Sequence, residues 1–185
     1  MGILKRLGAF FLDILEVIVF AVGIFFFVYL LIMRPHKIKG ESMVPNYPDG
    51  EYLLTEKVTY YKSDPKRGDV VVFKPPVSED EFIKRIIGLP GDTISLRGGK
   101  VYINGKMLNE NYLNSSLFTE AHPYLNEGID VKIADGDYIV MGDNRPSSYD
   151  SRSWGAIKKK DITGRAWLIY WPPKNAGVVI RPDYK

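Results

Sequence analysis

The sequence contains no cysteine and only two histidines, His36 and His122, among its 185 residues. The lack of cysteine excludes disulfides, thiolate metal sites and cysteine nucleophiles. A zinc site would need Asp or Glu for most of its ligands, so we expect neither a metal nor a cofactor. The net charge is only +3, and no basic stripe alternates with stacking aromatics, so we expect no nucleic-acid partner.

Hydrophobic residues are concentrated at the start of the chain, where they make up 26 of the first 33 positions. Residues 17–33 (VIVFAVGIFFFVYLLIM) carry no charge, and as a helix they would span roughly 25 Å of a ~30 Å hydrocarbon core. A buried core helix is disfavoured because the run has no polar face. A cleaved secretory signal would be shorter and would end at small residues. We therefore expect an uncleaved anchor in the lipid bilayer, with residues 1–35 as the anchor unit and a span of about 10–33.

The charges that flank the apolar run do not set its orientation. Lys5 and Arg6 precede it, whereas Arg34, Lys37 and Lys39 follow it closely. Positive residues favour the cytoplasmic side, and here the two sides are nearly balanced. Charge alone therefore leaves the topology open.

Residues 36–185 have the pattern of strands separated by turns. Twelve Pro and seventeen Gly interrupt the chain, and we find no long amphipathic helix after the anchor. Predicted strands are short β-branched or alternating runs, namely 70–73, 81–87, 93–96, 101–103, 138–141 and 165–170. These features predict a mainly β domain, a coiled antiparallel sheet of barrel-like form, with a small polar excursion at about 104–137.

Three clusters of residues could carry chemistry, and the first is Gly-Glu-Ser-Met-Val-Pro at residues 40–45. Ser42 follows the anchor closely, so it is expected to act near the membrane surface. Gly40 permits close backbone approach and Pro45 stiffens the chain after the serine. By itself this pattern is more typical of a turn than of a catalytic serine.

The second cluster spans residues 82–92 and contains a lysine between two bulky apolar residues. In a strand, Phe82, Lys84 and Ile86 share one face. If that face is buried, the cost of desolvating the ammonium lowers the pKa of Lys84, and a neutral amine can act as a general base. The alternative is a lysine that extends its charged end to the surface.

The third cluster, residues 141–155, is rich in small polar side chains and follows a predicted strand. It contains two Asp and two Arg between residues 143 and 152. It could be a surface loop held by Asp–Arg pairs, or a network that orients a catalytic pair. Phosphate binding is a third possibility, but the glycine pattern of a P-loop is missing.

Taken together and in this order behind an anchor, the three clusters resemble the boxes of bacterial type I signal peptidases in their short, single-span form. G-E-S-M-V-P resembles the family's G-x-S-M-x-P box, and K-R-I-I-G-L-P-G-D resembles its lysine box. The third cluster resembles G-D-N-R-x-x-S-x-D-S-R-x-W-G at every fixed position. The resemblance covers nearly the whole chain.

The resemblance implies a serine endopeptidase in which Ser42 is the nucleophile and Lys84 the general base. It implies that Ser148 hydrogen-bonds the Lys84 amine and orients it. Two supporting ion pairs are implied, Asp150 with Arg152 and Asp143 with Arg85. Shallow apolar pockets for small substrate side chains are implied at Ile38, Met43, Phe82 and Ile83.

The resemblance further implies the substrates and the cellular location of the enzyme. Its substrates would be precursor proteins that carry signal peptides, cut after small residues at the first and third positions before the scissile bond. The amino terminus would be cytoplasmic and the catalytic domain would lie on the extracytoplasmic side of the cell membrane, with the secretion translocon nearby. The sequence departs from the family pattern at Gly40, where some members have a serine that joins the oxyanion hole, and at Asn46, where threonine is usual.

Other classes of protein remain open from the residues alone. A Ser-His-Asp hydrolase would need His36 or His122 beside Ser42. Soluble self-cleaving repressors share Ser-Lys chemistry, but a DNA-binding head would replace the anchor. A membrane-tethered β domain that binds peptides without cutting them is the non-enzymatic alternative, and an inactive family member is disfavoured because both Ser42 and Lys84 are present.

Overall fold

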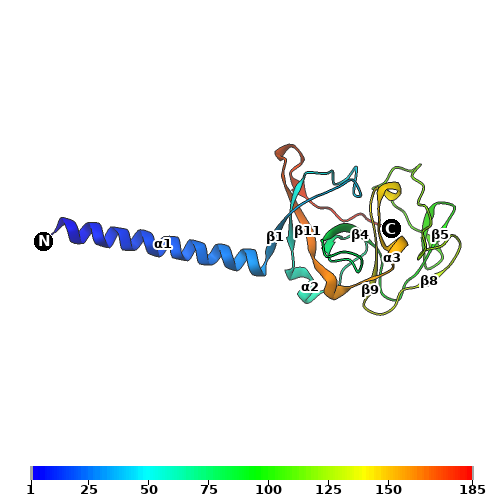
Figure 1. Ribbon diagram of the computed structural model, residues 1–185, viewed down its shortest axis with the longest axis horizontal. Helices are drawn as coiled ribbons and strands as arrows, with labels where there is room; N and C mark the ends of the chain where they lie inside the picture. Colours follow the sequence, from blue (N-terminus) through cyan, green and yellow to red (C-terminus); the bar gives the residue numbers. More distant parts are fainter. Residues whose placement is uncertain (1, 185) are drawn as a thin grey trace. The chain divides into compact units, whose positions relative to one another are not determined.

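The computed structural model describes residues 2–184, apart from the side chains of Leu4, Leu30 and Leu31. The chain forms two compact units, residues 1–34 and residues 35–185. The first unit is helical and the second is built mainly from short strands, some of which are labelled in Figure 1.

The first unit is the long helix α1 (Ile3–Leu31). Its segment Lys5–Tyr29 has a mean hydropathy of 2.6 and is not buried against protein anywhere. Among the described residues it is the one helix long and apolar enough to cross a membrane. The helix begins well before residue 10 and ends slightly before residue 33, the two bounds of the expected span. It cannot continue far because Pro35 disfavours the helical conformation at the residue before it.

The second unit contains a large curled sheet whose strands follow the order β1-β2-β11-β3-β4-β9-β10, with β12 beside β11. Every pair whose register is described runs antiparallel. β11 shifts register twice against β2, and such irregularities bend a strand and help a sheet to curl. The strands are β1 (Met33–Lys37), β2 (Tyr52–Glu56), β3 (Val70–Phe73), β4 (Phe82–Gly88), β9 (Asp137–Met141), β10 (Ile157–Lys158), β11 (Ile162–Trp171) and β12 (Gly177–Val178).

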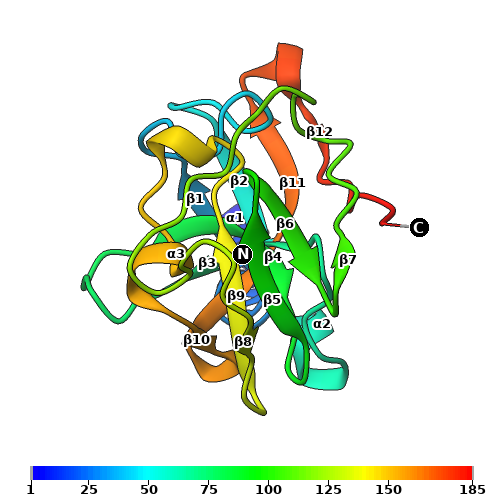
Figure 2. The same ribbon diagram turned by 90° about the vertical axis from the view of Figure 1, so that its right-hand side faces the viewer.

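A second, smaller antiparallel sheet has the order β7-β6-β5-β8. Its strands are β5 (Thr93–Arg97), β6 (Lys100–Ile103), β7 (Lys106–Met107) and β8 (Val131–Lys132). The β5–β6 hairpin turns at Gly98 and Gly99, both with positive φ, as a two-residue hairpin turn requires. Figure 2 shows these strands gathered on one side of the unit. Residues 108–130, between β7 and β8, form turns and one isolated bridge.

Short helices complete the second unit. They are α2 (Val58–Lys62), α3 (Ser151–Trp154) and three single 3₁₀ turns, Arg145–Ser147, Lys159–Asp161 and Pro173–Asn175. The expectation of a mainly β, coiled antiparallel fold behind one apolar helix is confirmed.

Strand β4 lies at the centre of the hydrophobic core. Ile86 and Ile87 are both fully buried, yet they point to opposite faces and join different apolar clusters. A third cluster packs residues of β2, β3 and β11 against Ile38, Met43 and Tyr47 from the loop after β1. Because β4 is buried on both faces, polar side chains on it are enclosed by protein.

Candidate active site

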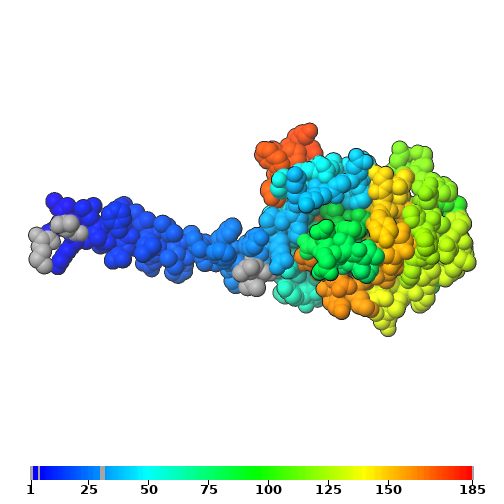
Figure 3. Space-filling model, viewed as in Figure 1, coloured from blue at the N-terminus to red at the C-terminus, as the bar shows by residue number. Residues whose placement is uncertain are grey.

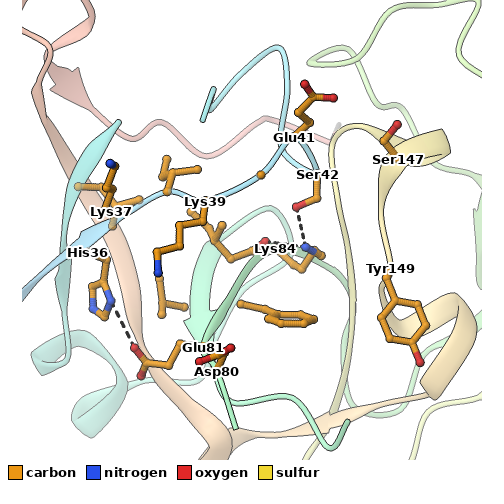
Figure 4. Close-up of a pocket in the computed structure, with 16 residues that line it drawn as sticks. His36, Lys37, Lys39, Glu41, Ser42, Asp80, Glu81, Lys84, Ser147 and Tyr149 are labelled. Carbon is orange, nitrogen blue, oxygen red and sulfur yellow. Dashed lines mark hydrogen bonds and ion pairs between the residues drawn. The ribbon is translucent and has the colours of Figure 1, made fainter. Parts of the chain in front are cut away.

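Ser42 lies in the loop between β1 and β2, whose backbone is fixed by local hydrogen bonds. Gly40 has a φ of +82°, a conformation that favours glycine, and its N–H donates to Asp49 Oδ1 at 2.7 Å. The Tyr47 N–H donates to the Met43 carbonyl at 2.9 Å. With the loop held in this way, the Ser42 side chain projects toward β4 (Figure 4).

Lys84 reaches the Ser42 hydroxyl from β4. Its Nζ lies 2.7 Å from Ser42 Oγ and 3.1 Å from the carbonyl of Ile83. The lysine is only 4% exposed. This burial lowers the pKa of Lys84 to about 8, although the negative charges of Asp150 and Asp143 act in the opposite direction. A substantial share of Lys84 is therefore neutral near pH 8, and a neutral amine can accept the serine proton.

Asn144 connects the third sequence cluster to the serine loop. Its backbone N–H donates to the Ser42 carbonyl and its side-chain amide donates to the Glu41 carbonyl, both at 3.0 Å. Two bonds from one residue thus fix the peptide groups on both sides of Ser42. This role was not predicted from the sequence, although Asn144 lies inside the third cluster.

Asp150 and Arg152 form a fully buried ion pair behind the serine and the lysine. Arg152 donates to both carboxylate oxygens of Asp150 at 2.9 Å, and the Gly142 N–H donates to Oδ2 at 3.0 Å. Burial raises the pKa of the Asp150 carboxyl, but the hydrogen bonds and charge of Arg152 outweigh it, so the pKa lies below its usual value. Asp150 is consequently an anion inside the protein.

Ser148 departs from the expectation that it binds the Lys84 amine. Its hydroxyl donates to Asp150 Oδ2 at 2.7 Å, whereas the Lys84 amine contacts Ser42 and Ile83. The buried carboxylate holds the hydroxyl proton of Ser148 in a strong hydrogen bond, and the Lys84 amine donates instead to Ser42 Oγ and the Ile83 carbonyl. Ser148 is therefore tied to the Asp150–Arg152 pair.

Gly142 allows the third cluster to approach the serine loop closely. A side chain at this position would place its Cβ 2.2 Å from Ser148 Oγ and 2.4 Å from the Ser42 carbonyl oxygen. Neither distance is possible for a real carbon atom. Only glycine lets the Ser42 backbone and the Ser148 hydroxyl lie against the same residue.

Arg85 and Asp143 are brought together as a second buried ion pair. Arg85 donates to the two carboxylate oxygens of Asp143 at 2.9 and 2.6 Å, and the side chains are 2% and 1% exposed. Burial opposes the charge on Arg85, but its hydrogen bonds and charge interaction with Asp143 raise the pKa above the usual value. Asn46, the departure from threonine, donates to Asp143 Oδ2 at 2.9 Å.

A cleft of about 550 Å³ opens beside Ser42 and Lys84. Figure 3 shows the three segments that meet on this face, residues near 40, near 80 and near 150. Figure 4 shows Ser42 and Lys84 at one end and the contact of His36 with Glu81 at the other. The lining residues are His36, Lys37, Ile38, Lys39, Gly40, Glu41, Ser42, Leu53, Val72, Asp80, Glu81, Phe82, Ile83, Lys84, Ser147 and Tyr149.

Three of the four residues expected to form substrate pockets line this cleft, and Met43 does not. Ile38, Phe82 and Ile83 border the cleft, but Met43 is 0% exposed and packs inside the apolar cluster of the second unit. The loop turns directly after Ser42, so the next side chain points inward. Leu53 and Val72, from strands β2 and β3, line the cleft instead and were not anticipated.

Both histidines have partners other than Ser42. His36 Nε2 lies 3.0 Å from Thr55 Oγ1, and its Nδ1 faces Glu81. His122 Nδ1 lies 2.8 Å from Ser153 Oγ. This geometry disfavours a Ser-His-Asp arrangement. Within residues 2–184, no three His, Asp or Glu side chains gather in a way that could hold a metal ion.

Comparison with known proteins identifies the family. Residues 11–171 match the model of the family described as signal peptidase, peptidase S26. A probable signal peptidase I-2 from Synechocystis sp. is 40% identical over 168 residues, which are 88% of this chain and 72% of that protein. Signal peptidase I P from Bacillus subtilis subsp. natto is 37% identical, over 91% of this chain and 93% of that protein.

Signal peptidase IB from Staphylococcus aureus is 38% identical over 84% of each chain. A crystal structure of a signal peptidase I from Enterococcus faecalis is 30% identical and covers 56% of this chain and 97% of that one, with a TM-score of 0.46. The family match spans most of the chain and includes the loop of Ser42, strand β4 and the third sequence cluster. The chain therefore belongs to the signal peptidase family, peptidase S26.

Proposed function

We propose that this protein is a membrane-anchored serine endopeptidase that removes signal peptides from precursor proteins with a Ser42–Lys84 dyad. The observation that carries the proposal is the 2.7 Å contact between the Ser42 hydroxyl and the buried Lys84 amine. A neutral amine at this distance can take the hydroxyl proton as Ser42 attacks the peptide carbonyl. The protonated Lys84 then gives its proton to the departing amine.

The reaction finishes with water. Attack of Ser42 forms a tetrahedral intermediate, which collapses to an ester between Ser42 and the signal peptide as the mature protein leaves. Lys84, neutral again, takes a proton from water as the water oxygen attacks the ester carbonyl. The acyl–Oγ bond then breaks, Lys84 returns the proton to Ser42 Oγ, and the signal peptide leaves as a free acid. Among the described residues none accepts a hydrogen bond from the Ser42 N–H, so this group is free to bind the oxyanion.

The cleft supports recognition of an extended peptide. Strand β4 pairs with β9 from Arg85 onward, so its edge at residues 82–84 has no β9 partner and borders the cleft. A substrate strand could add its backbone to this edge. The apolar side chains of Ile38, Ile83 and Leu53 would then accept small residues at the first and third positions before the cut.

The location of the enzyme in the membrane is part of the same proposal. Helix α1 would hold the enzyme in the bilayer, with the amino terminus in the cytoplasm, the catalytic unit outside and the translocon nearby. Substrates also carry an apolar helix, so the anchor would confine enzyme and substrate to one surface and raise their effective concentration. Neither a metal nor a cofactor has a step in this mechanism.

The direct test is cleavage of one precursor by the full-length protein in detergent. Mass spectrometry of the products should find a single cut that follows a small residue, with another small residue two positions earlier. The His36→Gln and His122→Ala variants should keep activity within about tenfold, because a lysine base needs no histidine. Binding of the precursor without any cut would favour the peptide-binding alternative, and loss of cleavage in a histidine variant would favour a Ser-His mechanism.

The pH dependence of the rate should follow the Lys84 amine. Only the neutral form accepts the serine proton, so kcat/KM should rise about tenfold per pH unit below the pKa of about 8 and level off above it. Initial rates between pH 6 and 10 on a peptide without ionisable side chains would measure this rise in kcat/KM. A flat profile over that range would contradict a lysine base.

A further inference from the structure

A short segment outside the cleft, Glu110–Tyr112, is docked against the residues that surround the active site. It belongs to the irregular stretch between β7 and β8. None of the residues from 110 to 112 lines the cleft beside Ser42. The segment nevertheless contacts the third sequence cluster, strand β4 and the serine loop.

The first contact is between Glu110 and Arg145. Both carboxylate oxygens of Glu110 accept hydrogen bonds from Arg145, whose side chain is fully buried. Arg145 Nε donates to the Gly142 carbonyl at 3.0 Å, and the Arg145 carbonyl accepts from Arg152 at 2.7 Å. Glu110 thus neutralises a cation that is bonded to the backbone of the third sequence cluster, residues 141–155, which we call the catalytic loop.

The second contact is made by the ring of Tyr112. The Arg85 guanidinium lies 4.2 Å from the centre of this ring, a cation–π distance. The same guanidinium binds Asp143. Tyr112 therefore covers the Arg85–Asp143 pair and keeps water from one side of it.

The third contact joins the segment to the serine loop through Asn46. Its side-chain amide donates to the Tyr112 carbonyl at 3.1 Å and to Asp143 Oδ2 at 2.9 Å. Asn46 lies four residues after Ser42. The hydroxyl of Tyr112 in turn donates to Glu110 at 2.8 Å, which ties the two ends of the segment together.

We infer that Glu110 and Tyr112 are positioning residues for the Ser42–Lys84 chemistry, and we call the segment Glu110–Tyr112 the brace. The inference rests on the proposed function. The brace holds three parts in fixed relation: the catalytic loop through Arg145, strand β4 through Arg85, and the serine loop through Asn46. Lys84 neighbours Arg85 on β4, so a shift of this strand moves the amine relative to Ser42.

The brace should affect the rate of the chemical step and leave substrate binding nearly unchanged. Its residues are outside the cleft, so they do not contact the peptide. A displacement of about 1 Å between reacting groups costs up to about 10²-fold in rate. The pH profile should also change, because the charges that act on Lys84 are Asp150, Asp143 and Arg152. Burial is the largest cause of the lowered pKa of Lys84, so water that enters beside β4 when the Tyr112 ring is removed reduces this desolvation and raises the pKa.

The experiment compares Tyr112→Leu with Tyr112→Phe in the full-length protein in detergent. Phenylalanine keeps the ring over Arg85 and the backbone carbonyl, and loses the hydroxyl bond to Glu110 and the longer bond that the hydroxyl accepts from Arg145 Nη2 at 3.4 Å. The substrate is an internally quenched peptide with alanine at the first and third positions before the cut. We expect Tyr112→Leu to lower kcat about tenfold, to change KM less than about twofold and to move the pH midpoint upward. Tyr112→Phe should stay within about threefold of the wild type.

The pH midpoint separates positioning from loss of folded protein, because an unfolded fraction that is constant with pH lowers the rate equally at every pH. A Tyr112→Leu enzyme with an unchanged midpoint, or with the same rate as Tyr112→Phe, would overturn the inference. Asn46→Ala is a second variant, which removes the exposed side chain that bonds the Tyr112 carbonyl and Asp143. The same upward shift of the pH midpoint is expected. Asn111→Ala, an exposed neighbour, is the matched control. If Ser42→Ala still cuts the peptide, the proposed function fails, whatever Tyr112→Leu does.

Discussion

The Lys84→Met variant should lose at least about 10³-fold in kcat/KM and remain folded. Methionine is close to lysine in length and is apolar, so it suits a side chain that is 4% exposed. The amine hydrogen-bonds Ser42 and Ile83, and its removal should change the free energy of unfolding by no more than about 1.5 kcal/mol. Activity and stability should therefore separate, because the amine serves the reaction more than the fold.

Two companion variants sharpen this result. Lys84→Arg keeps a positive charge but cannot lose its proton near neutral pH, so it should be as inactive as Lys84→Met. Ser42→Ala should be equally inactive, and the double variant should lose little more, because the two residues act as one unit. Lys106→Met, on the exposed β7, controls for removal of a lysine. Activity in Lys84→Arg would show that charge, and not proton transfer, is what Lys84 supplies.

The strands of the second unit could be predicted well where hydrophobic residues alternate or branch at Cβ. The run 70–73 is strand β3 as expected, and the turn at Gly98 and Gly99 joins β5 to β6. The two-residue strands β7, β8, β10 and β12 were not predicted. Such short strands form because of their partners across the sheet, and the local sequence pattern does not identify those partners.

The chemical roles of the site residues could be predicted from their residue types. The directions in which their side chains point could be predicted less well. Ser42 and Lys84 are 42 positions apart, yet the structure places their side chains in contact. The direction of Met43 could not be inferred because it lies in a loop, where the alternation of a strand does not apply. The choice of Ser148 between two partners depends on a rotating hydroxyl, which composition does not determine.

Asn46 and Glu110 were overlooked for a different reason. Asn46 was noted only as a departure from a family pattern, and Glu110 lies in a polar stretch with no periodicity. Their partners, Asp143 and Arg145, are 97 and 35 residues away in the sequence. Contacts between irregular segments follow from the packing of the whole unit, so local sequence patterns could not identify them.

The Arg152→Met variant should lose about 3–5 kcal/mol in the free energy of unfolding. Arg152 is 0% exposed and donates to both oxygens of Asp150, which is also fully buried. Its guanidinium also donates to the carbonyls of Glu120, Arg145 and Ser148. Removal of the cation leaves a buried carboxylate with only hydroxyl and backbone donors, and several carbonyls without a partner. Thermal unfolding of the full-length protein in detergent, followed by near-ultraviolet circular dichroism, would measure the loss.

The double variant Asp150→Asn with Arg152→Met separates the cost of an unpaired charge from the cost of lost packing. Removing both charges should recover part of the stability, because the amide needs less compensation than a carboxylate. If the double variant is less stable than Arg152→Met alone, the penalty does not come from the unpaired carboxylate. The pH dependence of catalysis provides a second, independent measurement on the same variants. Arg152 lowers the pKa of Lys84 and Asp150 raises it. Arg152→Met should therefore move the pH midpoint of any residual activity upward, and the double variant should move it back.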